Sequence, residues 1–248
     1  MQKKQKGSTT AFCLGIVLIG AVLQAGGALK GNRVVFPGLA EIGQALFRLL
    51  GDGNTYLKIG TTLIHVLEAL LISALIGILI GLAEGISGRI HSFFRPMMIL
   101  IRSMPMIVMV ILIMSMLEYR SVPVTAAGLI LIPVFSEAFY EGCRSLEPEL
   151  IDVYRMNGGF GFQVALHVYL PLISGYLKQA FVNAAGMGLK VVVSAEYLVQ
   201  TKDSLGKAVY SSAYFSEYAE IYAYALIMVF LVLLITEVPG LLIRKKTA

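Results

Sequence analysis

Long apolar runs alternate with short polar segments along the chain. Four runs approach or exceed the length of about 20 mostly apolar residues that a helix needs to cross a bilayer: Ile59–Ala83, Met97–Leu117, Val122–Phe139 and Tyr222–Ile243. Two further runs, Ala11–Leu29 and Leu166–Ala195, contain small or polar residues but are also long enough. The pattern predicts an all-α, polytopic membrane protein with about six transmembrane helices.

Two short segments between these runs have a helical pattern of their own. Leucine and isoleucine recur at helical spacing within Leu39–Leu50, and Gly51–Asn54 then breaks the pattern. We therefore expect a helix lying on the outer membrane surface. Pro148–Met156 begins with a residue suited to a first helical turn, has acidic Glu149 near the positive end of the helix dipole, and is followed by Gly158, which favours a stop. So short a helix outside the bilayer needs a partner surface.

Composition supports a membrane protein over a soluble one. Hydrophobic residues make up 57% of the chain and charged residues only 14%, against roughly a quarter charged in soluble domains. The net charge is +5, but the basic residues stand at the ends of the apolar runs and form no single patch for nucleic acid. Lysine and arginine clusters at both ends predict cytoplasmic N- and C-termini. The basic start and Ala11–Leu23 also resemble a signal peptide, although we expect a retained first helix.

One motif has a specific spacing. Asp152-Val153-Tyr154 is followed by three residues, Gly158, nine residues and Val168-Tyr169-Leu170-Pro171. This spacing resembles the cytoplasmic signature of ABC importer permeases, where an acidic residue and two alanines precede a glycine and Ile-x-Leu-Pro. Ile101–Pro105 and Ala195–Leu198 resemble segments of the nitrate, sulfonate and taurine branch. Together the matches cover roughly Tyr56–Arg244.

The resemblance implies a single permease domain over residues 1–248, with a first span at 11–29, a core at 56–244 and a coupling helix at about 148–157. In such permeases this helix docks on an ABC ATPase subunit dimer. The residues expected to couple to the ATPase are Glu149, Asp152, Val153, Tyr154, Gly158, Leu170 and Pro171. Val153 and Tyr154 replace the two small alanines, so the helix is expected to seat differently on its partner.

The resemblance also implies the surroundings of the protein. It places the chain in the inner (cytoplasmic) membrane in contact with lipid, with a second permease copy, as a homodimer or pseudo-dimer, and an extracytoplasmic substrate-binding protein. The implied substrate is a small organic or inorganic anion, such as a sulfonate, taurine or nitrate, or a vitamin precursor.

The sequence gives no sign of catalysis by the chain itself. It has no Gly-rich phosphate loop ending in Gly-Lys-Ser/Thr, so we expect no cofactor here, with ATP and Mg²⁺ bound by the partner ATPase. No catalytic or metal-ligating set is predicted, and Cys13 and Cys143 are interpreted as packing residues. A membrane-embedded enzyme and an ion-coupled secondary transporter remain alternatives, although neither catalytic motifs nor a convincing internal repeat is found.

Polar residues within the predicted spans are candidates for a translocation path, because charges at membrane depth are costly and seldom face lipid. His65 and Glu68, three residues apart, are expected to share a helix face and either to bond to each other or to line an aqueous route. Asn183 and Lys190 lie in the fifth run. Lys190 either lines the route, favouring an anionic substrate, or pairs with Glu196, which would cancel that inference; we favour the pair. The candidate path residues are therefore His65, Glu68, Asn183, Lys190 and Glu196.

Small residues recur at every fourth position in the second run, from Ala69 to Gly85. Such a stripe lets two helix backbones approach closely. We interpret it as a helix-packing surface.

Overall fold

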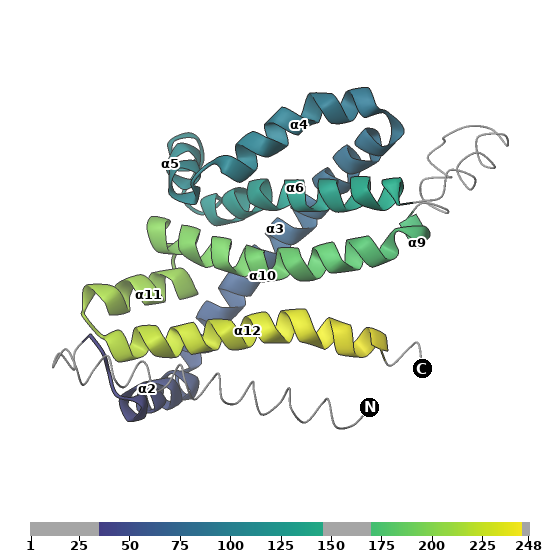
Figure 1. Cartoon of the computed structure of the whole chain (residues 1–248). Coiled ribbons are helices and arrows are strands. Elements are labelled where there is room, and N and C mark those ends of the chain that lie inside the picture. Colours follow the sequence, from purple (N-terminus) through teal and green to yellow (C-terminus); the bar gives the residue numbers. More distant parts are fainter. Residues whose placement is uncertain (1–34, 146–169, 245–248) are drawn as a thin grey trace.

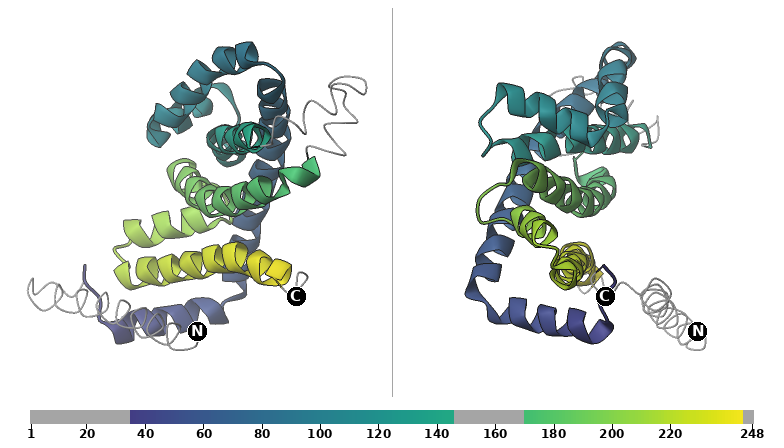
Figure 2. Two further views of the ribbon diagram at one scale, coloured as in Figure 1. Left: turned by 45° about the vertical axis from the view of Figure 1, so that its right-hand side comes forward. Right: turned by 90° about the vertical axis from the view of Figure 1, so that its left-hand side faces the viewer.

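A computed structural model describes residues 35–145 and 170–244 of the chain, and these residues form helices joined by short connections. The helices are α2 (Leu39–Gly51), α3 (Gly53–Ile86), α4 (Gly88–Ser103), α5 (Met106–Met116), α6 (Val122–Arg144), α9 (Leu170–Leu172), α10 (Ser174–Val199), α11 (Leu205–Tyr214) and α12 (Tyr218–Arg244). Figure 1 shows α6, α10 and α12 as a layer of roughly parallel rods, with α3 crossing behind them. The two turned views in Figure 2 show the same arrangement.

The long helices confirm most of the predicted spans within the described residues. The four that are long and apolar enough to cross a membrane cover Gly53–Gly85, Val122–Arg144, Ser174–Val199 and Tyr218–Thr236. Prediction placed the start of the fifth run at Leu166, but α10 begins only at Ser174, after the short helix α9, which contains Pro171. The predicted span Ala11–Leu29 lies outside the described residues. An all-helical polytopic membrane protein is thus confirmed.

The predicted third span, Met97–Leu117, is not one straight helix. Its residues belong to α4 and α5, whose axes differ by 103°. The cause is local: Met104 precedes Pro105, and its backbone is extended, with φ −72° and ψ 127°. A residue before proline is pushed away from the helical region, so α4 ends at Ser103 and α5 starts anew at Met106.

The helix predicted at Leu39–Leu50 is confirmed as α2, and its place on the membrane surface stays a prediction. It buries Ile42, Ala45 and Leu49 and packs beside α12. The predicted break after it is shorter than expected, because the Asp52 carboxylate accepts a hydrogen bond of 3.0 Å from the Asn54 amide. This bond caps α3, which therefore begins directly after Asp52.

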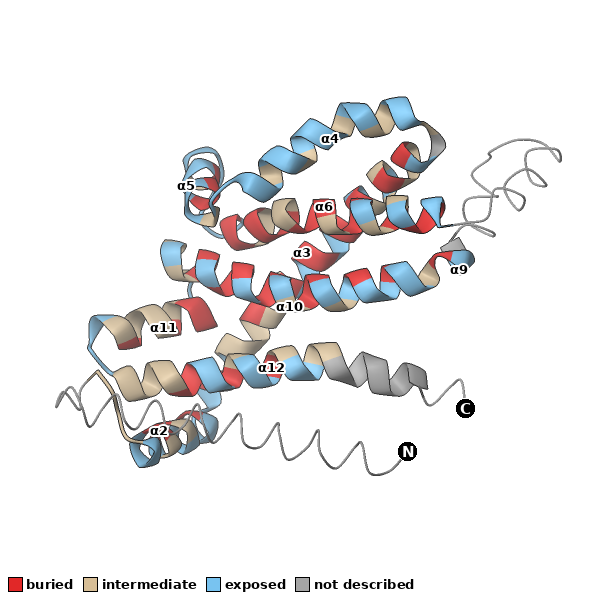
Figure 3. Ribbon diagram, in the orientation of Figure 1, coloured by how far each residue is buried: buried red, intermediate tan, exposed pale blue. Residues whose placement is uncertain are grey.

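The small-residue stripe of α3 is a packing surface, as predicted. A Cβ on Gly77 would lie 2.6 Å from the Cβ of Phe135, and one on Gly81 would lie 2.6 Å from the carbonyl oxygen of Ser136. Both contacts are with α6, whose Phe135 and Phe139 are almost fully buried. Figure 3 shows this buried strip along α6 and the buried middle of α3.

The two ends of the helix layer are different. In Figure 1, the C-terminal ends of α6 and α12 and the short helix α9 lie at one side, here called the α9 end. The turn between α11 and α12 and the C-terminal end of α10 lie at the opposite side, here called the α11 end. The helices α6, α10 and α12 therefore run between these two ends.

Candidate functional site

One face of α10 is exposed and carries polar side chains along the whole helix. Its residues are spaced three or four apart, which places them on one side of a helix: Tyr176, Gln179, Asn183, Met187, Lys190, Ser194 and Leu198. We call this set the α10 stripe. The opposite side of α10 is buried against the bundle through residues such as Ala184, Leu189 and Val192. The alternation of exposed and buried turns is visible in Figure 3.

The first half of the α10 stripe lines a cavity of about 540 Å³ between α4, α6 and α10. Gln179 donates a hydrogen bond of 3.0 Å from its Nε2 to the Oδ1 of Asn183. On the other wall, the guanidinium of Arg102 donates to the carbonyl oxygen of Pro133 at 2.9 Å and pairs with the carboxylate of Glu137. The cavity therefore has hydrogen-bonding groups on both walls.

The exposed faces of α3 and α12 are largely apolar, apart from Glu68 of α3. On α3 the exposed side chains include Ile64, Leu67, Leu71, Leu75 and Leu79, and on α12 they include Leu226, Val229, Phe230 and Leu233. Such faces suit lipid, whereas polar groups at membrane depth need water or protein beside them. The α10 stripe, together with the exposed Glu137 and Glu141 of α6 that line the same cavity, is thus better suited to contact water than the exposed faces of α3 and α12.

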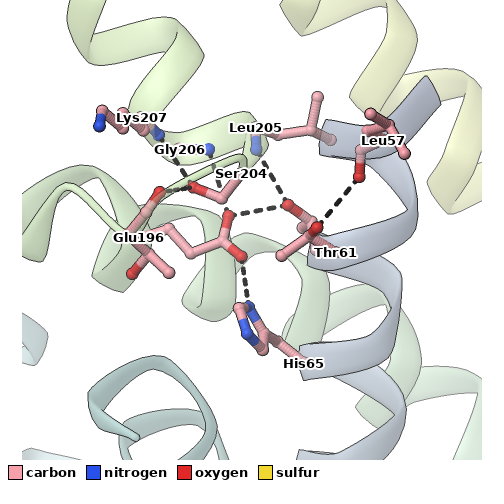
Figure 4. Close-up of polar contacts among 10 residues, drawn as sticks. Leu57, Thr61, His65, Glu196, Ser204, Leu205, Gly206 and Lys207 are labelled. Atoms are coloured by element: carbon pink, nitrogen blue, oxygen red, sulfur yellow. Dashed lines mark hydrogen bonds and ion pairs between the residues drawn. The ribbon is translucent and has the colours of Figure 1, made fainter. Parts of the chain in front are cut away.

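A buried carboxylate fixes how α10 is rotated. Glu196 is completely buried and accepts hydrogen bonds from the Thr62 hydroxyl at 2.9 Å and from the Gly206 amide at 3.2 Å. Its second oxygen lies 2.8 Å from Nδ1 of His65. Figure 4 shows these groups converging from α3, α10 and the start of α11. A buried charge is tolerated where its hydrogen-bonding capacity is filled in this way.

The start of α11 is built around the same carboxylate. The Leu205 amide donates to the Thr62 hydroxyl at 3.0 Å, and Ser204 caps the helix by accepting from the Lys207 amide at 3.2 Å. No room exists for a side chain at Gly206, where a Cβ would lie 2.4 Å from the Cβ of Glu196 and 2.5 Å from the Tyr197 amide nitrogen. We call the contacts among Thr62, His65, Glu196, Leu205 and Gly206 the Glu196 junction.

The Glu196 junction corrects two expectations. Lys190 forms no pair with Glu196, because six residues along a helix place two side chains about 120° apart, and Glu196 is directed into the bundle while Lys190 is exposed. His65 bonds to Glu196 and not to Glu68, and Glu68 lies on the exposed apolar face of α3. The structure thus brings His65 and Glu196 together and separates Glu68 and Lys190 from them.

Sequence reasoning missed several residues of this region. Thr62, Gln179 and Ser194 were not singled out. The polar residues of the α10 stripe could have been found from their spacing of three or four. Thr62 could not, since a threonine in apolar surroundings is usually a packing residue.

A family model now decides the class of the protein. The model of the binding-protein-dependent transport system inner membrane component matches residues 73–244. The chain belongs to this family. It is therefore the permease component of a binding-protein-dependent ABC transporter, and a multi-pass membrane protein.

Solved structures agree with the fold of this permease. A chain from the inward-facing MetNI methionine ABC transporter, in a native crystal form, matches with a TM-score of 0.59 and 18% identity, covering 77% of the permease and 96% of that chain. A second crystal form, from a selenomethionine soak, matches with a TM-score of 0.55 and 19% identity, covering 73% and 92%. Identities this low show a shared fold alone. No curated protein sequence matches the chain.

Most of the predicted ATPase-coupling residues of the permease lie outside the described residues: Glu149, Asp152, Val153, Tyr154 and Gly158. Leu170 and Pro171 belong to α9. The helices that flank residues 146–169 are α6 and α9, which meet at the α9 end (Figure 1). The role of these seven residues in coupling to the ATPase stays a prediction.

Proposed function

We propose that two copies of this permease enclose a substrate path along their α10 stripes, in an importer driven by a separate ABC ATPase. The exposed polar stripe and its cavity support this proposal. A single copy would present Asn183, Lys190 and Ser194 to lipid, where polar groups are costly. A second copy facing the stripe would remove that cost and would enclose an aqueous route.

The proposed orientation places the α9 end in the cytoplasm, with both termini on that side. Arg144 and Arg244 are at the ends of α6 and α12, and Arg89 and Arg95 are in the first half of α4. Arginines next to spans favour the cytoplasmic side. Residues 148–157, which follow α6, would then reach the ATPase as a coupling helix, and the ATPase would bind ATP and Mg²⁺. An extracytoplasmic binding protein would deliver substrate at the α11 end.

For the substrate, the resemblance of Ile101–Pro105 and Ala195–Leu198 to the sulfonate and nitrate branch supports a small organic or inorganic anion, such as a sulfonate, taurine or nitrate. A vitamin precursor is the other candidate. Both are small enough for a cavity of about 540 Å³, so size does not separate them.

Thiol labelling tests the path. Asn183→Cys would be placed in a cysteine-free permease, assembled with its ATPase and binding protein in proteoliposomes, and treated with a membrane-impermeant maleimide. We expect labelling whose rate changes when ATP is trapped on the ATPase. Leu67→Cys is the control within the span, because its α3 neighbour Val66 lies beside Gly188 of α10, five residues from Asn183, while Leu67 is on the largely apolar face. Equal and nucleotide-independent labelling at the two positions would contradict the proposed path.

A further inference from the structure

Lys190 is a cation deep within the span of α10. At 1.5 Å per residue it lies about 24 Å from the first residue of the helix and about 14 Å from the last, so both distances place it inside a hydrocarbon core of about 30 Å. It is exposed, and its neighbours on the α10 stripe are Met187 and Ser194. A lysine at this depth must face water or an opposite charge.

No carboxylate pairs with Lys190 among the described residues. The ion pairs found there join Arg48 to Glu220, His65 to Glu196, His91 to Glu84 and Arg102 to Glu137. Glu196, the expected partner, is saturated by Thr62, His65 and Gly206. Glu196 therefore does not cancel the charge of Lys190.

Lys190 is also the single formal charge on the α10 stripe. The other members are aromatic, apolar or neutral polar residues. Gln179 and Asn183 bond to each other, and the Ser194 hydroxyl donates to the carbonyl oxygen of Lys190 itself at 2.8 Å. Nothing else on the stripe offsets the positive potential of this ammonium group.

We propose that Lys190 is the charge-selecting residue of the path, and that the transported substrate is a small anion and not an uncharged precursor. This inference rests on the proposed function, because two copies would bring two Lys190 ammonium groups to one route. A cation in a narrow route with low-dielectric walls raises the local concentration of anions and repels cations. The neutral polar neighbours of Lys190 would then form hydrogen bonds with the substrate without selecting the sign of its charge.

The test measures the charge preference of the route directly and does not need the natural substrate. Ser194→Cys, one turn beyond Lys190 on the same face, is introduced with Cys13→Ser and Cys143→Ala. The full complex in proteoliposomes is treated with a sulfonatoethyl or a trimethylammonioethyl methanethiosulfonate, which are similar in size and opposite in charge. We expect the anionic reagent to be favoured. Lys190→Gln should lower the ratio of the two rates by about tenfold, the scale of one nearby unit charge at intermediate dielectric; Lys190→Arg should preserve it.

Each outcome has one meaning. An unchanged rate ratio in Lys190→Gln would overturn charge selection by Lys190 while leaving the path intact. Failure of both reagents to reach Ser194→Cys would instead contradict the path. If Lys190→Gln does not assemble, the Ser194→Cys permease with native Lys190 is measured at increasing salt concentration. Screening should then reduce the ratio of the anionic to the cationic reaction rate toward that of free thiols. A ratio that does not change with salt would overturn the proposal. Restored assembly in the Lys190→Glu/Glu68→Lys double variant would show that Lys190 pairs with Glu68 of another copy. That result would also overturn the proposal.

Discussion

Nδ1 of His65 lies 2.8 Å from a carboxylate oxygen of Glu196, although 131 positions separate the two residues in the sequence. The contact joins α3 to α10 close to the start of α11. It holds Glu196 on the buried side of α10, opposite the exposed α10 stripe. The site proposed for transport thus depends on a buried polar contact that does not itself face the path.

The Glu196 junction predicts a stability difference between two glutamates. Glu196→Gln keeps the shape of the side chain but turns an NH₂ group toward hydrogen-bond donors, so we expect a loss of about 1–3 kcal/mol in the free energy of unfolding. Glu68→Gln, on the exposed face of α3, is the matched control and should change it by less than about 0.5 kcal/mol. Unfolding of the purified permease in detergent would measure both. Equal effects would mean that the junction contributes no particular stability.

Gly206 gives a second prediction about the same junction. Gly206→Ala places a Cβ 2.4 Å from that of Glu196 and against backbone atoms, so α11 must shift, at a cost of about 1–3 kcal/mol. Gly186→Ala is the control within α10, because its nearest neighbour would be 3.6 Å away; alanine there should be neutral or stabilising by up to about 1 kcal/mol. Thermal unfolding in detergent distinguishes the two, and a neutral Gly206→Ala would refute the tight packing.

The orientation gives a topological prediction. Cysteines replacing Asn54 and Lys202, which are exposed near the α11 end, should react with an impermeant thiol reagent added outside intact cells. Cysteines replacing Lys4 and Lys245 should react only after the membrane is made permeable, because the basic termini favour the cytoplasm. Labelling of both termini from outside would contradict the proposed orientation.

Much of the fold was predictable because hydropathy and length alone identify a membrane-spanning helix. The bent pair α4 and α5 was missed for a physical reason: hydropathy averages over a window, whereas a single X-Pro step at Met104-Pro105 ends a helix. The signal was present in the sequence, but the apolar run outweighed it. The helix α2 was predicted correctly, since its amphipathic spacing is regular.

The site was less predictable, because it depends on how helices are rotated against one another. His65 and Glu68 share a helix face by spacing, yet His65 turns toward a carboxylate on another helix. The register between α3 and α10 decides this, and nothing in either segment alone fixes it. In contrast, pairing of Lys190 with Glu196 could have been excluded from the sequence, because helix geometry places their side chains about 120° apart.

The most direct test of the central claim, that this permease takes its energy from a separate ATPase, uses the segment that follows α6. The native permease should co-purify with its ATPase and show ATP hydrolysis stimulated by the loaded binding protein. Asp152→Lys reverses a charge at the proposed docking surface, where like-charge contacts cost several kcal/mol, and should insert and dimerise normally while losing both properties. Lys202→Glu, a charge reversal near the α11 end, is the control and should retain both. Full co-purification and full stimulation in Asp152→Lys would contradict the account.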